Sequence, residues 1–292
     1  MSNEASVSGL TFGSLFAGIG GFDLGFERAG MECRWQVEID PYCQKVLAKH
    51  WPNIRRWSDI RKFPDADTID DWRAIKVDVI CGGFPCQDIS SAGHGAGITG
   101  ERSGLWFEFA RIIRVLRPRF VVVENVPALL TRGIDAVLGS LAALGFDAEW
   151  ECLPASAFGA PHRRDRIWIV AYAKRDGRQQ GPEVFRRRES EPAACGEVVA
   201  DATDATESEG RGNTNGGTVC LNVSNPDSIE KEWPSITWRQ RGHWESEPDV
   251  GRVAHGVPKR VDRLRGLGNS VVPQIAEWIG RRIVIFEANS NT

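Results

Sequence analysis

The stretch GLTFGSLFAGIGGFDLGFERAG, residues 9–30, decides the fold class. Its first eight residues have the apolar character of a β-strand, and its last ten have the amphipathic pattern of a helix that ends at Gly30. Between them, Gly18, Gly20 and Gly21 form a turn in which a ligand can approach the backbone and sit at the helix N-terminus. A strand, a glycine-rich turn and a helix in this order predict the first unit of a parallel α/β sheet.

The rest of the chain divides into a periodic part and an irregular part. After the first strand and helix, further strands are predicted at 35–40, 76–83, 119–126 and 165–173, and further helices at 104–118 and 134–145. After Ala173 the chain is rich in Gly, Ser, Thr, Asn and charged residues, and helical patterning returns only at 272–288. The pattern predicts a Rossmann-like α/β domain followed by a small, loop-rich insertion.

Composition limits the class of protein. The chain has 292 residues, of which 41% are hydrophobic, enough for a sizeable core. The formal charge of -3 excludes a uniformly basic surface, so any nucleic-acid surface must be local. Seven cysteines without a CxxC pair argue against a disulfide framework and a zinc ribbon, and they favour a cytoplasmic protein. No signal peptide or membrane-spanning apolar run is found, so no membrane partner is expected.

Two acids after the glycine turn suggest a cofactor. Glu38 ends the second predicted strand, where nucleotide-binding sheets place an acid for ribose hydroxyls. The alternative is a solvated surface glutamate. Asp59 either receives an adenine amino group or caps the residues that follow it. Asp23 stands at the third glycine position of the G-x-G-x-x-G pattern, which favours an adenosine cofactor without pyrophosphate contacts. A glycine turn used only for packing remains the alternative.

Three further residue types converge on one edge of the predicted sheet. Cys86 follows a predicted central strand, at the edge where α/β sheets bind ligands, and a structural thiol is its alternative. Glu124 ends the next strand after four apolar residues; burial there raises its pKa and lets it donate a proton, whereas capping is the alternative. By strand alternation, Arg164 and Arg166 point to one side and Arg163 to the other, unless the run is only a solvated basic surface.

These motifs resemble, in their order, those of the cytosine-C5 DNA methyltransferase family of bacterial or phage type. The resemblance rests on FAGIGG, EID, SDI, PCQDIS, ENV, PHRRDR and RLRGLGNSVVP, and covers about 10–172 and 256–283. It implies an S-adenosylmethionine-dependent methyltransferase fold with a seven-stranded sheet. The implied domains are a catalytic and cofactor-binding domain at 1–173, a target-recognition insertion at 174–255 and a C-terminal segment at 256–292 that returns to the first domain.

The resemblance also implies a role for each matching residue. Cys86 is the expected nucleophile, Glu124 the contact to the N3 and amino edge of cytosine, Arg166 the contact to O2, and Arg164 a supporting residue. The expected contacts to S-adenosylmethionine are Phe16, Gly18, Gly20, Glu38, Asp59 and Asn269. The family pattern opens its arginine motif with Gln, whereas this sequence has His162, so the surroundings of the arginines are expected to differ.

The implied reaction is methylation of carbon 5 of a flipped-out cytosine in a specific double-stranded DNA sequence, through a covalent bond between Cys86 and C6. A monomer is expected, and a cognate restriction endonuclease that acts separately is the other partner considered. Three alternatives stay open: an RNA cytosine-C5 methyltransferase, a non-catalytic nucleic-acid-binding relative and a dehydrogenase. Seven basic residues against two acids across 251–282 support a polyanionic partner.

Overall fold

The computed structural model describes residues 9–64, 72–85, 104–174, 182–185 and 260–290. The strands are β1 (Thr11–Leu15), β2 (Glu32–Val37), β3 (Arg55–Trp57), β4 (Val79–Gly82), β5 (Phe120–Asn125), β6 (Phe146–Pro154) and β7 (Asp165–Ala173). The α-helices are α1 (Gly21–Arg28), α2 (Pro41–His50), α3 (Leu105–Leu116), α4 (Leu129–Arg132), α5 (Ile134–Ala143), α7 (Arg260–Gly268) and α8 (Pro273–Ser290). Short 3-10 helices are η1 (Ile60–Lys62), η2 (Trp72–Ile75) and η4 (Ala155–Phe158).

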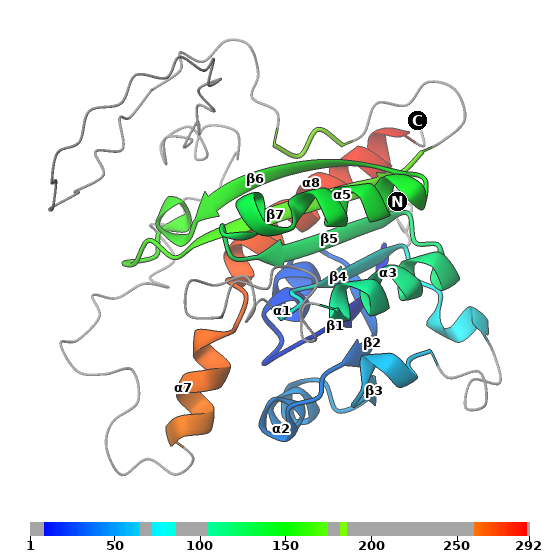
Figure 1. The fold of residues 1–292 in the computed structure, drawn as a ribbon. Coiled ribbons are helices and arrows are strands. Elements are labelled where there is room, and N and C mark those ends of the chain that lie inside the picture. Colours follow the sequence, from blue (N-terminus) through cyan, green and yellow to red (C-terminus); the bar gives the residue numbers. More distant parts are fainter. Residues whose placement is uncertain (1–8, 65–71, 86–103, 175–181, 186–259, 291–292) are drawn as a thin grey trace, which may run out of the picture.

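The strands form one seven-stranded sheet in the order β3-β2-β1-β4-β5-β7-β6. Strands β1 to β5 pair in parallel, whereas β7 runs antiparallel to both β5 and β6. The strand order reverses between β1 and β4, because the chain builds outward to β3 on one side and to β5 on the other (Figure 1). The predicted Rossmann-like fold class is confirmed, and this reversal is where such sheets bind ligands.

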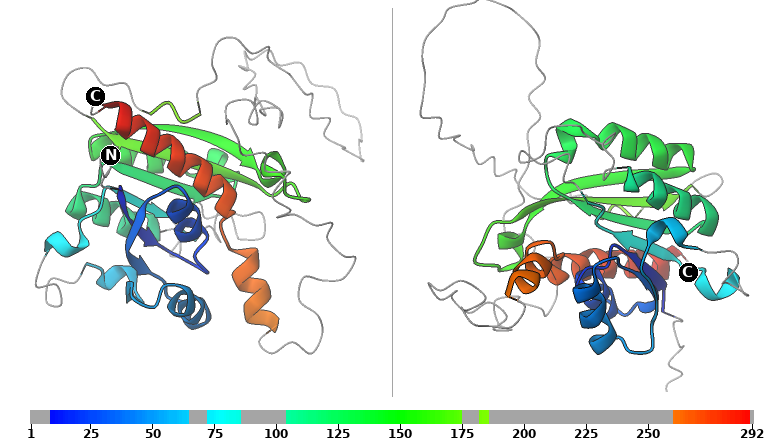
Figure 2. Two further views of the ribbon diagram at one scale, coloured as in Figure 1. Left: turned by 180° about the vertical axis from the view of Figure 1, so that it is seen from behind. Right: turned by 60° about the horizontal axis from the view of Figure 1, so that its bottom comes forward.

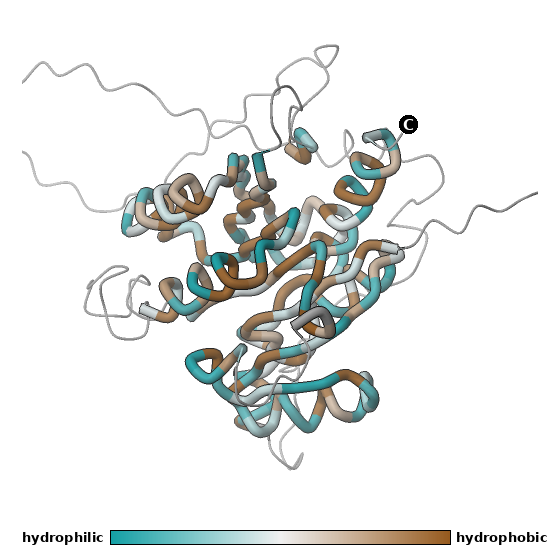
Figure 3. Tube along the Cα trace, turned by 90° about the vertical axis from the view of Figure 1, so that its right-hand side faces the viewer, coloured by the Kyte–Doolittle hydropathy of each residue, from teal (hydrophilic) through white to brown (hydrophobic). Residues whose placement is uncertain are grey.

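Two apolar layers hold the sheet. One core cluster lies between the sheet and helices α3 and α5, and the other lies between the sheet and helices α1 and α8 (Figure 2). Strand β5 contributes side chains to both clusters: Val121 and Val123 belong to the first cluster, and Phe120 and Val122 belong to the second. Its continuous apolar run is therefore explained by burial on both faces. In Figure 3, hydrophobic residues gather along the strands between the helix layers.

Helix α8 packs closely against helix α1, although some 250 residues of chain separate them. A Cβ atom on Gly25 would lie 2.5 Å from the carbonyl oxygen of Pro273 and 2.6 Å from the Cβ of Ala276. Glycine at this position thus allows the two helices to approach. The contact brings the turn before α8 to the carboxyl edge of the sheet. The domain boundaries stay predictions, because residues 186–259 lie outside the described ranges.

Several elements of the structure were not predicted from the sequence by residue range, among them strands β3 and β6 and helices α2 and α7. The prediction that helical patterning returns only at 272–288 was wrong, because α7 is also a helix. Its sequence RVDRLRGLG gave a weak signal, since its apolar residues Val261, Leu264 and Leu267 are exposed rather than packed on a core. Helix α2 was not predicted, although Asp40 accepts hydrogen bonds from the N–H groups of Tyr42 and Cys43 as its N-cap. None of the helices within the described ranges is long and apolar enough to cross a membrane.

Candidate active site

The carboxyl ends of β1, β4 and β5 lie side by side at the point where the strand order reverses. Strand β1 leads into the glycine turn, β4 leads into Gly83, Phe84 and Pro85, and β5 ends with Glu124 and Asn125. The side-chain amide of Asn125 donates a hydrogen bond of 3.3 Å to the carbonyl of Phe84. Cys86 is the next residue after Pro85 and lies outside the described residues, so its role stays a prediction.

Glu124 is the central acid of this edge. Its Oε1 lies 3.0 Å from Nε of Arg166, and its side chain is 12% exposed. A Cβ atom on Gly83 would stand 2.8 Å from Oε2 of Glu124, so the absence of a side chain there leaves room for the carboxylate. The side chain of Glu124 therefore lies beside the segment that leads into Cys86. The two are neighbours because β5, which carries Glu124, pairs with β4, which leads into this segment.

Burial raises the pKa of Glu124 to about 7, although the guanidinium groups of Arg166 and Arg164 oppose this shift. Desolvation thus outweighs the attraction of two cations. The direction agrees with the prediction from the four apolar residues that precede Glu124. A carboxyl group with this pKa can donate a proton near neutral pH.

The arginines at the start of β7 take different partners. Nη1 of Arg166 donates to the carbonyl of Asp165 at 2.7 Å, while its Nε faces Glu124. Arg164, whose φ of 40° is in the left-handed region, donates to the carbonyls of Gly268 and Ser270, each at 2.7 Å. Both guanidinium groups lower the pKa of Glu124, but Arg164 precedes β7 and has a positive φ, so strand alternation does not set its direction. Arg163 instead forms a surface ion pair of 2.9 Å with Asp165.

Arg164 also connects the arginine motif to Asn269. This residue lies between the two carbonyls that Arg164 holds, and its side chain is exposed. The same segment touches the glycine turn, because a Cβ atom on Gly266 would lie 3.3 Å from the side chain of Ile19. The segment that carries Asn269 therefore lies beside the glycine turn, and the cofactor-binding role of Asn269 stays a prediction.

The glycines of the turn differ in their surroundings. Among the described residues, a Cβ atom on Gly18, whose φ is 58°, would meet only the carbonyl oxygen of Phe16 at 4.0 Å, so no described side chain covers the backbone there. A Cβ atom on Gly20, whose φ is 90°, would overlap the ring of Trp51. Gly18 is thus open to a ligand, whereas packing and φ account for Gly20. Phe16 begins the turn with a φ of 53°, and its ring lies 6.4 Å from that of Phe109.

Glu38 is buried beside Gly18. Its Oε2 accepts a hydrogen bond from the N–H of Gly18, and its Oε1 accepts one from the N–H of Asp40, each at 2.7 Å. Desolvation raises the pKa of Glu38. Each oxygen of a carboxylate has two lone pairs, so both can still accept a ribose hydroxyl. The alternative of a solvated surface glutamate is excluded by this burial.

Ile39 is a further candidate for this site that was not predicted from the sequence. Its side chain is 64% exposed, directly after the buried Glu38. An exposed large apolar side chain at a ligand-binding edge offers a surface for a flat ring. The signal was present in the sequence EID, where an isoleucine stands between two acids. Gly18, Glu38 and Ile39 together fit an adenosine moiety.

Asp59 is engaged as a cap. Its carboxylate accepts from the N–H of Arg61 at 3.0 Å and pairs with the guanidinium of the same residue at 2.9 Å. Hydrogen bonding to Arg61 lowers the pKa of Asp59. The capping alternative is what the structure displays, and contact with an adenine amino group stays a prediction.

The described basic side chains of 261–282 differ in their surroundings. On α8, Arg281 pairs with the buried Glu277 at 2.7 Å, and Arg282 lies over the ring of Trp278 at 4.4 Å. On α7, Arg263 is exposed and Arg265 pairs with Asp40 at 3.3 Å. Within the described ranges, α7 therefore offers the more accessible cations for phosphate groups.

The described cysteines are structural thiols. Desolvation raises the pKa of Cys43 to about 12 and that of Cys152 to about 11, and it also raises the pKa of Cys33 and of Cys81. None of the four forms a disulfide. Such thiols are poor nucleophiles, since the thiolate is the reactive form. No group of three or more His, Cys, Asp or Glu side chains in the described part of the chain could hold a metal ion.

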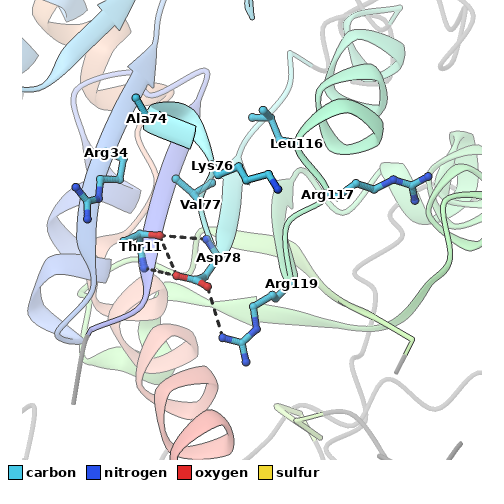
Figure 4. Close-up of a pocket in the computed structure, with 9 residues that line it drawn as sticks. All are labelled: Thr11, Arg34, Ala74, Lys76, Val77, Asp78, Leu116, Arg117 and Arg119. Carbon is cyan, nitrogen blue, oxygen red and sulfur yellow. Dashed lines mark hydrogen bonds and ion pairs between the residues drawn. The ribbon is translucent and has the colours of Figure 1, made fainter. Parts of the chain in front are cut away.

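A cavity of about 470 Å³ lies at the opposite, amino-terminal edge of the sheet (Figure 4). Its lining residues are Thr11, Arg34, Ala74, Lys76, Val77, Asp78, Leu116, Arg117 and Arg119. The carboxylate of Asp78 is engaged in hydrogen bonds within the protein: its Oδ2 accepts one from the N–H and one from the hydroxyl of Thr11, each at 2.9 Å. Helix α3 ends at this cavity, and nearby cations offset the negative end of its dipole. None of the predicted site residues lines it.

Comparisons with known proteins show what the chain is similar to. The family model described as C-5 cytosine-specific DNA methylase matches residues 10–247, most of the chain. The chain is 32% identical over 187 residues to Type II methyltransferase M2.BsuMI of Bacillus subtilis, covering 61% of this chain and 45% of that protein. It is 32% identical over 173 residues to Type II methyltransferase M.HhaI of Haemophilus parahaemolyticus, covering 58% of this chain and 51% of that protein.

The chain thus spans about half the length of the curated relatives it matches. Among solved structures, it resembles one described as a DNA modification methyltransferase encoded within a prophage of E. coli. The TM-score is 0.59 at 20% identity, over 96% of this chain and 100% of that chain. At this identity the likeness concerns the fold.

Proposed function

Because the chain belongs to the C-5 cytosine-specific DNA methylase family, we propose that it methylates carbon 5 of cytosine in a specific double-stranded DNA sequence. The observation that carries the proposal is the pair formed by Glu124 and Arg166 at the carboxyl edge of the sheet. Glu124 holds a proton near neutral pH, since burial raises its pKa to about 7. A carboxylic acid beside a guanidinium suits the N3 and O2 atoms of cytosine.

The chemistry explains why a thiol is needed. Carbon 5 of cytosine is a weak nucleophile, so we propose that the thiolate of Cys86 forms a bond with C6, which makes C5 enamine-like. Negative charge then develops on the ring. Glu124 donates a proton toward N3, and the N–H groups of Arg166 that do not bind Glu124 or Asp165 donate to O2. After C5 is methylated, a base removes the C5 proton, and elimination releases the thiolate while the N3 proton returns to Glu124, which restores the ring.

S-adenosylmethionine is the proposed methyl donor, and when bound it supplies an electrophilic methyl group. Gly18 leaves its backbone open to the ligand, Glu38 accepts hydrogen bonds from ribose hydroxyls, and Ile39 packs against the adenine ring. Asn269 completes the site from the segment that Arg164 holds. The cytosine must leave the base stack to reach Glu124, at a cost of about a few kcal/mol.

Replacing Glu38 by glutamine should weaken S-adenosylmethionine binding by about 10 to 100-fold, the range expected for losing hydrogen bonds to a charged group. An amide has one oxygen, so it cannot accept from Gly18, Asp40 and two ribose hydroxyls together. Isothermal titration calorimetry measures the dissociation constant. The matched control is Glu32→Gln, an exposed glutamate at the other end of β2. Equal affinity of Glu38→Gln and wild type would remove Glu38 from the cofactor site.

Two glycines with positive φ test whether a ligand approaches Gly18. Gly18 (φ 58°) and Gly30 (φ 88°) both lie in the left-handed region, and among the described residues a Cβ atom on either would meet no atom closer than 4.0 Å. Gly18→Ala and Gly30→Ala should therefore lose a similar stability, about 1 kcal/mol each. Only Gly18→Ala should weaken S-adenosylmethionine binding. Urea denaturation and calorimetry on both variants separate strain from ligand contact, and a matched loss of affinity in both would contradict the assignment.

The reaction itself is tested by expression in a bacterial host that lacks DNA methylation. Base-resolution sequencing of 5-methylcytosine should reveal modification at one short recurring sequence. Absence of 5-methylcytosine in DNA, with its presence in tRNA, would instead support an RNA cytosine-C5 methyltransferase. The target sequence, a cognate restriction endonuclease and the monomeric state stay predictions.

A further inference from the structure

A buried carboxylate lies directly beneath the glycine turn, and the proposed reaction does not use it. Asp23, in the first turn of α1, is 0% exposed. It accepts hydrogen bonds from Nε2 of Gln36 at 2.7 Å, from the hydroxyl of Ser14 at 3.2 Å and from the thiol of Cys33 at 3.6 Å. All three donors are neutral, so they satisfy the carboxylate without cancelling its charge.

The donors occupy defined positions on two strands. Ser14 on β1 and Gln36 on β2 are register partners in the sheet. Each lies two residues before a member of the candidate cofactor site: Ser14 precedes Phe16, and Gln36 precedes Glu38. The two strand ends then meet again where the N–H of Gly18 donates to Glu38 at 2.7 Å. The carboxylate therefore joins β1, β2 and α1 just below the cofactor site.

A second set of contacts closes this network around the turn. Oε1 of Gln36 accepts from Nε of Arg56 at 2.7 Å, and Nη2 of Arg56 donates to the carbonyls of Leu47 and Trp51 at the end of α2. Nε1 of Trp51 donates to Glu27 of α1 at 2.7 Å. The ring of Trp51 also fills the space beside Gly20. The network thus begins and ends on α1 and encloses the turn.

Burial of this carboxylate opposes its ionised form. Desolvation raises the pKa of Asp23 to about 6, and the hydrogen bonds from Gln36, Cys33 and Ser14 only partly offset the effect. A neutral side chain of similar size would avoid this desolvation. A buried ionisable group in such a place is a candidate for a functional role.

We propose that Asp23 is a positioning residue for the cofactor site: its carboxylate fixes the ends of β1 and β2, and through them the amide of Gly18 and the carboxylate of Glu38. The inference rests on the proposed function, in which these groups bind S-adenosylmethionine. Asp23 itself does not contact the ligand, since it is fully buried below the turn. Its effect should fall on affinity for the cofactor rather than on the chemical step.

The test uses the full-length protein and compares Asp23→Asn with wild type. Asp23→Asn should weaken S-adenosylmethionine binding about tenfold, the size expected for one lost hydrogen bond to a charged acceptor. KM for S-adenosylmethionine should rise by a similar factor, while kcat at saturating cofactor should stay within about twofold. The melting temperature should not fall, because the amide removes a buried charge. Asp135→Asn is the matched control, an exposed aspartate in the first turn of α5.

A rescue variant separates positioning from general damage. In Asp23→Asn/Gln36→Glu the carboxylate moves to β2, where it can accept from the new amide and pair with Arg56. Affinity should return to within about threefold of wild type. If Asp23→Asn does not fold, Ser14→Ala replaces it, since it removes one donor, and a loss of about threefold is expected. An unchanged dissociation constant in the folded variant would overturn the inference. Failure of the wild type to bind S-adenosylmethionine would instead contradict the proposed function.

Discussion

Replacing Cys86 by alanine should reduce methyl transfer to cytosine by at least about 10⁴-fold, because removal of a covalent nucleophile leaves only binding and electrostatic effects. Cofactor binding should stay within about twofold of wild type, since the groups proposed to bind the cofactor lie after β1 and β2 and before α8, not in the segment that follows β4. Single-turnover transfer of labelled methyl groups to DNA measures the first quantity, and calorimetry measures the second. Cys86 directly follows the described segment that Asn125 holds and that runs beside Glu124.

The control for this variant is Cys152→Ala. Desolvation raises the pKa of Cys152 to about 11, so it is not a thiolate near neutral pH, and its loss should leave turnover unchanged. A second readout reports the covalent bond itself. DNA with 5-fluorocytosine at the target has no C5 proton to lose, so it should remain bonded to wild type and not to Cys86→Ala. Turnover by Cys86→Ala near the wild-type rate would remove Cys86 from the mechanism.

The sequence predicted the fold well where burial follows a simple period. The apolar run before Glu124 predicted a strand, and it also predicted the direction of the pKa shift of Glu124. The glycine turn was placed correctly between β1 and α1. Both features depend on residues that are neighbours in the chain, so the local sequence pattern was sufficient to predict them.

Features that depend on neighbours in space were not predictable in this way. The sequence could not tell Gly18, which no described side chain covers, from Gly20, which is packed by Trp51 from another element. It left open whether Asp59 binds a cofactor or caps η1, because both uses need an exposed carboxylate. From the sequence, Asp23 was noted only because it replaces the third glycine of the G-x-G-x-x-G pattern. Its hydrogen-bond partners Ser14 and Gln36 could not be predicted, since they lie on two different strands. Helix α7 was missed because its apolar residues are exposed.

Glu124→Gln should lower kcat by about 100-fold or more while leaving S-adenosylmethionine affinity unchanged. The amide can still donate to N3 of cytosine and accept from its amino group, but it cannot transfer a proton. The wild-type rate should fall above about pH 7, because the protonated form of Glu124 acts and its pKa is about 7. The variant should lack this decline. Glu108→Gln, on the surface of α3, is the control.

Glu124→Gln, which should lower activity, should raise the stability of the fold at alkaline pH. The pKa of Glu124 is raised from 4.5 to about 7 in the fold, so the folded state binds the proton more tightly than the unfolded state does. Stability must then fall as pH rises between these two values, by up to about 3 kcal/mol. Glu124→Gln removes this loss, so it should be more stable than wild type at pH 8, and the difference should shrink toward pH 5. Urea denaturation at both pH values measures it. A variant equally active at pH 8, or a stability difference independent of pH, would show that Glu124 is an ordinary ionised surface acid, and the proposed proton transfer to N3 would then have no donor.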